Sequence, residues 1–387
     1  MKEADLIARL EDLAPLLEEN ALRAERERKP VDSVMSAIEA TGAYLYFVPK
    51  RFGGYEFSVE GFMRIGMSLG EACMSTAWVT TFCMEHNWLL ALFCQEAQED
   101  IFGSQPYIIG PGMLAPMGEA TPEDGGFRLT GRWEWGTGVM HADWVLVGAR
   151  TAGCDPQQPD LYMYALPRSE VTVVDTWNPS GMVGTGSNEV HIDNVFVPGH
   201  RRQDVNGLRD GGSPGARWHD RPLYRMPMLP FLGLTATAPL VGGARKAVRL
   251  FQQRVAKRAV YGTADKQKER AVIQARLGRV TARIVGLEKQ LLGLGAETYA
   301  LGTRGGTSQA VERAELRVRV AMLVREARDI VTEVIEASGA HAHFLDNPLQ
   351  RIQRDINTAA GHTVFDLDAG TELYGRLLLG YPPNLPV

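Results

Sequence analysis

Cysteine is scarce in this sequence, and its few cysteines are not spaced for metal binding or cross-linking. The 387 residues contain four, Cys73, Cys83, Cys94 and Cys154, with no C-x-x-C pair. Three of them lie in one apolar stretch, so we expect buried free thiols in a reducing compartment. The pattern argues against both a disulfide-stapled domain and a structural zinc site.

Long hydrophobic runs and a strong charge of one sign are also missing. The longest uncharged run, 226–244, is interrupted by Pro227, Pro230 and Pro239, which predicts a buried loop and helix rather than a membrane span. The first residues indicate a charged amphipathic helix, so we expect no cleaved leader and a cytoplasmic location. A net charge of −5 offers no basic surface for nucleic acid.

The composition, 45% hydrophobic and 22% charged, is typical of a globular protein whose length allows two or three domains. Residues 1–106 are mostly helical in pattern, and the PKRFGG phrase at 49–54 predicts a turn between helices. Residues 107–215 change to short strands, with Phe127 to Trp135 alternating on one face. We predict an antiparallel β-barrel there, followed by a mobile loop or linker at 203–221.

The last segment, 216–387, carries two long apolar stripes that alternate steps of three and four residues. This spacing predicts bundled antiparallel helices. The stripes consist of Ile273, Leu277, Val280, Ile284, Leu287, Leu291 and Leu294, and of Leu316, Val320, Leu323, Ala327, Ile330 and Val334. The predicted fold is therefore α+β: an N-terminal helical domain, a middle antiparallel β-barrel and a C-terminal four-helix bundle.

Three phrases in this order resemble the acyl-CoA dehydrogenase superfamily over nearly the whole chain: WEWGTG at 133–138, GMVGTGSNEVHIDNVFVP at 181–198 and KRAVYG at 257–262. A dinucleotide fingerprint is excluded, because Glu189 stands where the last glycine of GTGSNE belongs and a strand pattern follows. Single aromatics in strands are usually packing residues, but the phrases together favour a flavin site.

The resemblance implies that Trp135 lies against the flavin ring and that the Thr137 hydroxyl lies near its N5 atom. A flat aromatic ring, a hydroxyl and a guanidinium suit the ring system and phosphate of such a cofactor. It further implies that Arg258, Gly262 and Gln274 contact the cofactor of a neighbouring subunit. The remaining residues that it places at the cofactor are Gly138, His141, Thr185 and Ser187.

The catalytic base of the dehydrogenases is missing at its usual place. After the pair Arg354-Asp355, His362-Thr363 stand where a Tyr-Glu pair would fall, and Glu372 is the substitute that remains. Removal of a proton beside a thioester needs a placed carboxylate. We interpret Asp355 as a structural residue paired to an arginine, on the same helix face as His362.

A related branch fits these residues better. PKRFGG, ACMSTAWVTTFCMEHNW at 72–88, TGVMHADW at 137–144 and the R-D-…-H pattern resemble flavin-dependent monooxygenases, the oxygenase components of two-component systems. Examples are 4-hydroxyphenylacetate 3-hydroxylase and the hydroxylases of secosteroid and polyketide phenols. The sequence departs from them at Thr137, where serine is frequent, and at 110–118, which lacks a serine found in some phenol hydroxylases.

This resemblance implies an oxidoreductase that uses O₂ and reduced FMN or FAD, supplied by a separate NAD(P)H-dependent reductase. A flavin C4a-hydroperoxide would transfer one oxygen atom to a phenol-like substrate. His362 is the candidate base or hydrogen-bond partner, His86 the second histidine of the pocket, and Thr137 the residue at flavin N5. A homotetramer is implied as well, and His341 and His343 are expected to bind no metal.

Other functions stay open at this point. The same fold supports oxygenation at nitrogen or sulfur of an amino sugar, amine or thiophene-type substrate. An acyl-CoA dehydrogenase-like flavoenzyme with Glu372 as base and a non-catalytic binding protein are further alternatives. The sequence distinguishes neither FMN from FAD nor one substrate from another.

Overall fold

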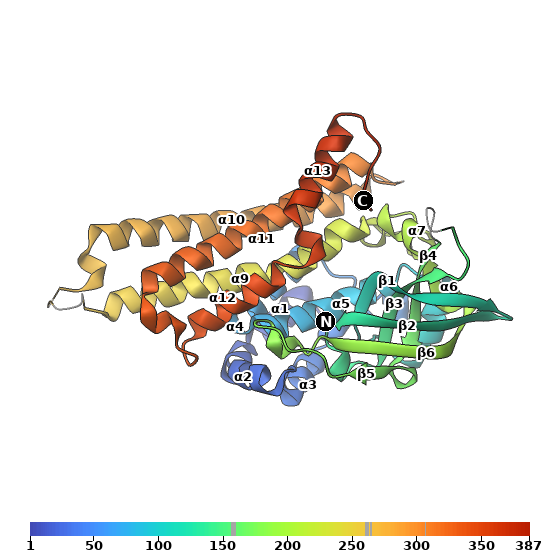
Figure 1. Cartoon of the computed structure of the whole chain (residues 1–387), viewed down its shortest axis with the longest axis horizontal. Helices are drawn as coiled ribbons and strands as arrows, with labels where there is room; N and C mark the ends of the chain where they lie inside the picture. Colours follow the sequence, from blue (N-terminus) through green and yellow to red (C-terminus); the bar gives the residue numbers. More distant parts are fainter. Residues whose placement is uncertain (156–159, 260–262, 264, 306) are drawn as a thin grey trace.

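The chain passes from helices to a sheet and then to long helices, as the sequence predicts (Figure 1). The computed structural model describes residues 1–155, 160–259, 263, 265–305 and 307–387. The PKRFGG turn is confirmed as a short 3₁₀ helix followed by Gly53 at φ +85°, a conformation that glycine adopts freely. The N-terminal helices are α1 (Glu3–Glu11), α2 (Ala14–Glu27), α3 (Asp32–Ala40), α4 (Val59–Ala72), α5 (Met74–Leu90) and α6 (Gln95–Ser104).

Helix α5 lies at the centre of the molecule. Nearly all of its side chains are buried, because α4, the long helix α9 (Met228–Lys257) and the sheet-side connections pack around it. A helix that is covered on all sides needs no polar face, which explains why its apolar and polar residues do not separate onto two sides. All four cysteines are free; of the three in the apolar stretch, Cys73 and Cys83 are buried as predicted, whereas Cys94 is partly exposed.

The middle of the chain forms one sheet of seven strands in the order β5-β6-β2-β1-β3-β4-β7. Its end strands, β5 and β7, are not paired with each other among the described residues, so a closed barrel is not confirmed. The prediction of a purely antiparallel sheet is wrong, because β1 and β3 pair in parallel. The strands are β1 (Gly112–Glu123), β2 (Gly126–Gly136), β3 (Trp144–Thr151), β4 (Leu161–Pro167), β5 (Thr172–Val174), β6 (Asn188–Pro198) and β7 (Arg202–Asp204).

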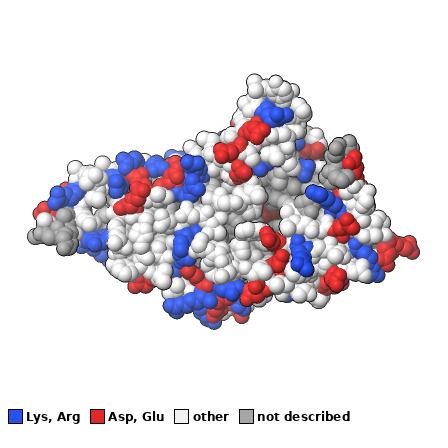
Figure 2. All heavy atoms as spheres, viewed as in Figure 1, with Lys and Arg blue, Asp and Glu red and all other residues white. Residues whose placement is uncertain are grey.

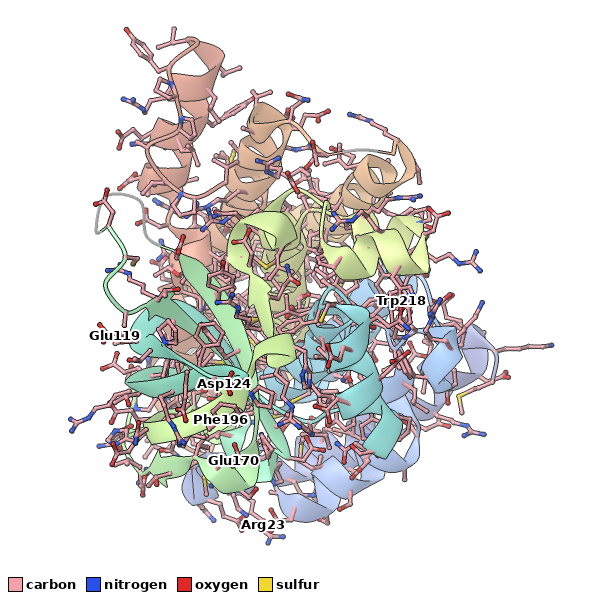
Figure 3. All side chains as sticks on the ribbon, turned by 90° about the vertical axis from the view of Figure 1, so that its right-hand side faces the viewer. Arg23, Glu119, Asp124, Glu170, Phe196 and Trp218 are labelled. Carbon is pink, nitrogen blue, oxygen red and sulfur yellow. The ribbon has the colours of Figure 1, made fainter. Side chains whose placement is uncertain are left out.

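The sheet is buried on both faces in its central strands. In β3, Val145 and Val147 enter a core within the curved sheet, while Trp144 and Leu146 enter the core shared with the helices. Successive side chains of a strand point to opposite faces, so burial on both sides requires a continuous apolar run. Figure 3 views this end of the molecule, with Glu119 labelled on the sheet side and Trp218 on the helical side.

Two details of the strand prediction need correction. Trp135 does not continue the buried face of Trp133; its backbone has φ +68° and 59% of its surface is exposed. The segment 203–221 is not an unstructured linker, because it contains β7, α7 (Val205–Arg209) and α8 (Pro214–His219). Ser213 caps α8 by accepting a hydrogen bond from the Ala216 amide, a local signal that starts a helix.

The C-terminal helices form the predicted bundle, which extends away from the sheet (Figure 1). Helix α9 packs against α10 and α11, and α12 packs on α9 and α11. Both predicted stripes face the interior, where Leu287 and Ile330 are among the fully covered residues. The remaining helices are α10 (Ala271–Thr303), α11 (Ala310–Ser338), α12 (Pro348–Ala359) and α13 (Leu367–Leu378). The domain boundaries after residues 106 and 215 stay predictions.

The molecular surface carries a mixture of acidic and basic side chains. Figure 2 shows both signs interspersed on one face, which is hollowed below the projecting C-terminal part, between the bundle and the sheet. Within the part of the chain that the structure describes, no helix combines the length and apolar composition needed to cross a bilayer.

Candidate active site

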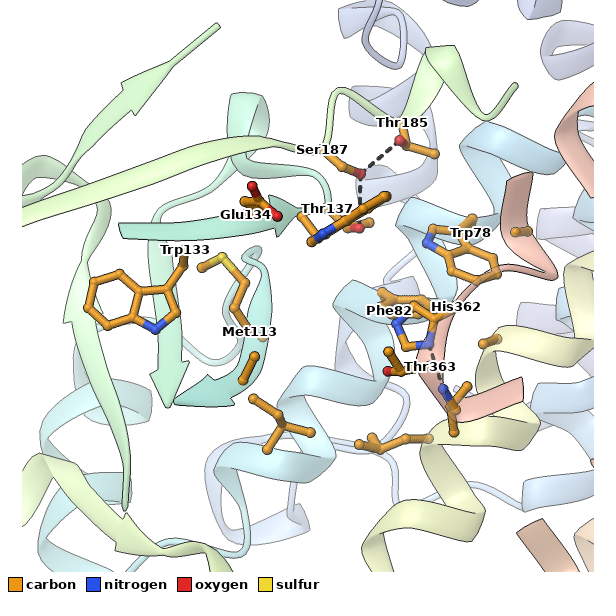
Figure 4. Close-up of a pocket in the computed structure, with 18 of the residues that line it drawn as sticks. Trp78, Phe82, Met113, Trp133, Glu134, Thr137, Thr185, Ser187, His362 and Thr363 are labelled. Carbon is orange, nitrogen blue, oxygen red and sulfur yellow. Dashed lines mark hydrogen bonds between the residues drawn. The ribbon is translucent and has the colours of Figure 1, made fainter. Parts of the chain in front are cut away.

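A cavity of about 620 Å³ lies where the sheet, α5, α9 and the end of α12 meet. Figure 4 shows Thr137, Ser187 and Thr185 on the sheet side of it and Trp78, Phe82 and His362 on the helical side. Most of its wall is apolar, a surface that suits flat organic molecules and excludes water. Polar side chains project from it at a few places, and these define what the cavity can bind.

On the sheet side, three hydroxyl groups form a chain. Thr137 Oγ1 lies 3.0 Å from Ser187 Oγ, which lies 2.8 Å from Thr185 Oγ1, and Thr185 donates to the Met182 carbonyl at 2.9 Å. Since each hydroxyl has one proton, donation by Thr185 to Met182 leaves Ser187 to donate to Thr185 and Thr137 to donate to Ser187. Thr137 then offers an oxygen lone pair to a ligand N–H.

Trp135 lies beside this chain in a strained backbone conformation. A positive φ is costly for a bulky residue and persists at functional sites where the surroundings enforce it. The indole lines the cavity and contacts Trp177 edge to face, with 5.2 Å between the ring centroids. An exposed indole next to a hydroxyl acceptor fits an isoalloxazine ring, which presents an aromatic face and, when reduced, an N–H at N5.

One face of α5 forms much of the helical wall of the cavity. Trp78, Phe82, Glu85, His86 and Leu89 line it, and their spacing of three or four residues places them on one side of the helix. Trp78 and Phe82 stack with 4.7 Å between centroids, and Phe82 meets His86 edge to face at 5.8 Å. The ring of His362 lies 6.2 Å from that of Trp78.

His86 presents a hydrogen-bond acceptor. Its Nδ1 lies 2.6 Å from the Gly110 carbonyl oxygen, so Nδ1 carries the proton and Nε2 has a free lone pair. Burial lowers the pKa of His86 to about 4, which keeps the ring neutral at pH 7. Gly112 makes room for it, because a Cβ at that position would lie 2.7 Å from Nε2.

His362 presents a hydrogen-bond donor, whereas His86 presents an acceptor. Its Nδ1 accepts a hydrogen bond from the Val364 amide at 3.2 Å, so the proton of the neutral ring resides on Nε2. Desolvation by the surrounding cavity wall lowers its pKa to about 4, although the residue itself is exposed. Of the two predicted roles of His362, base and hydrogen-bond partner, these features favour the hydrogen-bond partner. It follows the end of α12 and is not on the helix face that we predicted.

Asp355 has a structural position, but its predicted pairing with an arginine is wrong. The carboxylate accepts the Met182 amide at 2.6 Å, and burial raises its pKa to about 6. The neighbouring Arg354 instead pairs with Glu25 at 2.7 Å and donates to the Ser180 carbonyl. These contacts tie α12 to the loop before β6, whose Met182, Thr185 and Ser187 line the cavity.

Other predicted site residues lie at the edge of the cavity or away from it. Gly138 adopts φ +76° and packs against Val79 of α5. His141 bonds to Asp32 at 2.9 Å and does not line the cavity. Glu372 is exposed and accepts from Asn384, so it offers no base there.

The residues predicted to serve a neighbouring subunit lie at the far end of the bundle. Arg258 ends α9, and Gln274 lies in the first turn of α10, where its side chain donates to the Lys268 carbonyl. Gly262 lies outside the described residues. Among the residues that the structure describes, no cluster of His, Cys, Asp and Glu could hold a metal ion.

Sequence reasoning did not single out several cavity residues, among them Trp78 and Trp177, and it gave Glu85 no role of its own. The helical spacing from Trp78 to His86 was a usable signal for the first. Glu85 is the most unexpected, because it is 1% exposed and its Oε1 has no hydrogen-bond partner. Burial raises its pKa well above the usual value.

His86 makes the protein sensitive to acid. Between pH 6.5, its usual pKa, and about 4, the unfolded chain binds a proton that the folded protein does not. The free energy of unfolding therefore falls as the pH drops through this window, by up to about 1.4 kcal/mol per pH unit from this residue. Urea unfolding at pH 7.0 and 5.5 should show a smaller loss for His86→Gln than for the wild type. An equal loss would show that His86 is not buried in its neutral form.

Comparison with known proteins is consistent with this geometry. Residues 234–367 match the family model described as acyl-CoA dehydrogenase, C-terminal domain. The chain is 32% identical over 375 residues to the flavin-dependent monooxygenase oxygenase subunit HsaA of Rhodococcus jostii, covering 97% of this chain and 98% of that protein. It is 29% identical to the FADH₂-dependent resorcinol hydroxylase, oxygenase component, of a Rhizobium species, covering 98% and 95%.

Solved structures give the same result. The crystal structure of the HsaA monooxygenase from Mycobacterium tuberculosis superposes with a TM-score of 0.92 at 29% identity, and the two chains cover each other completely, at 100% each. The likeness therefore extends over the helices, the sheet and the bundle.

Proposed function

Because the chain belongs to the flavin-dependent monooxygenases that serve as oxygenase components of two-component systems, with an acyl-CoA dehydrogenase-like fold, we propose that it hydroxylates a phenol-like aromatic compound. Reduced flavin, when bound, supplies the activation of O₂. A separate NAD(P)H-dependent reductase supplies the reduced flavin. FMN and FAD are both candidates, and an aromatic substrate is supported by the resorcinol hydroxylase among the relatives.

One observation carries the proposal: a single apolar cavity joins a wall suited to a flavin ring with two neutral histidines of opposite hydrogen-bonding character. Trp135, Thr137 and Ser187 would hold the ring and its N5 atom. The apolar side chains of α5 and α9 keep water from the reacting atoms. Trp78 and Phe82 offer flat surfaces for an aromatic substrate.

The two histidines can form different hydrogen bonds with the substrate. The Nε2–H of His362 can donate to the phenolic oxygen and stabilise the negative charge that makes the ring carbons more nucleophilic. The free Nε2 of His86 can accept a proton from a substrate hydroxyl in a hydrogen bond. Both rings are neutral at pH 7, because burial lowers each pKa to about 4.

The test is incorporation of oxygen from ¹⁸O₂. The purified protein, supplied with photoreduced FMN or FAD, is mixed with ¹⁸O₂ and a panel of phenols, amines and thiophenes. A hydroxylated phenol that carries one ¹⁸O atom supports the proposal. Labelled products from the amines or thiophenes alone would instead assign oxygenation at nitrogen or sulfur, and no labelled product from any compound would contradict it.

A homotetramer is part of the proposal. Val285 and Tyr299 of α10 and Met322 of α11 are exposed along the bundle, an apolar surface that a second copy would cover. Arg258 and Gln274 at the far end of the bundle would then reach a neighbour's cofactor. Light scattering at micromolar concentration should give four times the chain mass, and a monomer would contradict this assembly.

A further inference from the structure

Asp355 is a buried carboxylate of α12 that lies behind the cavity wall and does not line it. Its Oδ1 accepts a short hydrogen bond from the Met182 amide, at 2.6 Å. Met182 has φ +54°, a backbone conformation that is unfavourable for a residue with a Cβ. Such a conformation persists where the surroundings enforce it, and the hydrogen bond to Asp355 is one of the contacts that do so.

The backbone at Gly181 shows how closely the loop before β6 is held to α12. A Cβ at residue 181 would overlap the Arg354 carbonyl, so the approach requires glycine. Arg354 adds a second contact by donating to the Ser180 carbonyl at 2.7 Å. Helix α12 therefore fixes residues 180–182 of this loop.

The Met182 carbonyl in turn binds two side chains of the cavity wall. The Trp177 indole N–H donates to it at 3.1 Å, and the Thr185 hydroxyl donates to it at 2.9 Å. Trp177 contacts Trp135 edge to face. Thr185 begins the hydroxyl chain that ends at Thr137 (Figure 4). One backbone residue therefore orients both the aromatic pair and the hydroxyl chain.

The hydroxyl chain can run in one direction only. A carbonyl oxygen has no proton to donate, so the proton between Thr185 and Met182 belongs to the Thr185 hydroxyl. Reversal of the chain would turn this proton toward Ser187 and leave the Met182 carbonyl and the Thr185 oxygen 2.9 Å apart with no proton between them. An unmade hydrogen bond in a buried site is costly, so Thr137 keeps a lone pair available to the cavity.

This direction distinguishes the two redox forms of a flavin. N5 of a reduced flavin carries an N–H that the Thr137 oxygen can accept. N5 of an oxidised flavin is itself an acceptor, so it would face the Thr137 lone pair without a proton between the two atoms. A chain that cannot reverse therefore favours the reduced form.

We infer that Asp355 is a positioning residue for the flavin: by holding Met182, it fixes the direction of the hydroxyl chain, and the site thereby binds reduced flavin in preference to oxidised flavin. The inference rests on the proposed function, since it concerns the cofactor of the same cavity. Asp355 acts through Met182 and does not reach the cavity itself.

The experiment measures the dissociation constants of reduced and oxidised FMN and FAD for the full chain without substrate, by calorimetric titration that is anaerobic for the reduced forms. The wild type should bind reduced flavin about 10-fold more tightly than oxidised flavin. Asp355→Leu has a similar shape but accepts no hydrogen bond, and it should lower this ratio to about 2-fold or less. Asp355→Asn should retain most of the ratio, because its amide oxygen can still accept the Met182 amide.

The matched control is Asn347→Ala, which removes the side-chain cap at the other end of α12. It should keep the wild-type ratio of the two dissociation constants, because it loosens the same helix without changing the contact with Met182.

Thr185→Val breaks the same chain one hydrogen bond farther on and tests it even if Asp355→Leu does not fold. Without the Thr185 hydroxyl, Ser187 can donate to Thr137, and the Thr137 proton can then turn toward N5 of an oxidised flavin. The ratio should again fall to about 2-fold or less. Thr185→Ser keeps a hydroxyl at this position and should keep the ratio.

The outcomes separate this inference from the proposed function. A wild-type ratio that persists in Asp355→Leu or in Thr185→Val would overturn the inference. Equal weakening of both redox forms would overturn it as well, because a merely structural role predicts that result. Either outcome leaves the proposed function standing if ¹⁸O enters a phenol, whereas a wild-type protein that binds neither form of flavin would contradict both.

Discussion

Replacement of His362 by alanine is expected to lower the rate of phenol hydroxylation about 100- to 1,000-fold, the usual cost of removing one placed donor to a developing oxyanion. The reason is the hydrogen bond between its Nδ1 and the Val364 amide, which leaves Nε2–H directed to the cavity. Flavin binding should change little, because the hydroxyl chain lies on the sheet side (Figure 4) and Trp135 belongs to β2. Oxygen consumption should therefore continue while hydroxylated product is lost.

His362→Gln distinguishes a hydrogen-bond donor from a base. Its amide N–H can replace Nε2–H, so it should recover part of the lost rate, whereas an amide cannot act as a base. The measurement is the ratio of product formed to oxygen consumed in single-turnover experiments. His341→Ala, at an exposed histidine outside the cavity, is the control and should behave as the wild type. Equal loss in His362→Gln and His362→Ala would contradict the donor role.

Trp135→Gly is expected to weaken the binding of reduced flavin about 10- to 100-fold, because the variant lacks the indole that would cover the flavin ring. The free energy of unfolding should stay the same or rise, by up to about 2 kcal/mol, because glycine adopts φ +68° without strain. Weaker cofactor binding together with unchanged or greater stability is the signature of a strained residue kept for function.

The control for this variant is Asn194→Gly. Asn194 also has a positive φ, at an irregularity where β6 pairs with β2, but it is exposed and does not line the cavity. Anaerobic calorimetric titration with reduced FMN and FAD gives the affinity for reduced flavin, and urea unfolding gives the free energy of unfolding. If Trp135→Gly bound reduced flavin as tightly as Asn194→Gly does, the indole would not be part of the flavin site.

The stripes of the bundle could be predicted from the sequence because each helix buries one face and exposes the other. Leu287 and Ile330 follow this rule, and the structure places both in the interior. Helix α5 gave no such signal, since it is covered on all sides and its apolar pattern has no preferred face. The spacing of Trp78 and His86 indicates a shared helix face, but nothing in the sequence shows that Glu85 beside them is buried.

Local backbone geometry accounts for the other errors. Trp135 fits the alternating pattern of β2, but a tight turn of the backbone, in which the Thr137 amide bonds to the Trp135 carbonyl at 2.8 Å, brings the indole to the cavity. His362 was expected on a helix face, yet α12 ends at Ala359 and the histidine caps the next short 3₁₀ helix.

The most direct test of the central claim is rapid mixing of the protein and photoreduced FMN or FAD with oxygenated buffer. The account predicts a transient near-ultraviolet absorbance, distinct from those of reduced and oxidised flavin, that lasts for seconds because the apolar cavity excludes water. The flavin that gives the longer-lived species would be identified as the preferred one. Return to oxidised flavin at the rate of free flavin in solution, with no such species, would contradict the claim that this cavity activates oxygen for transfer.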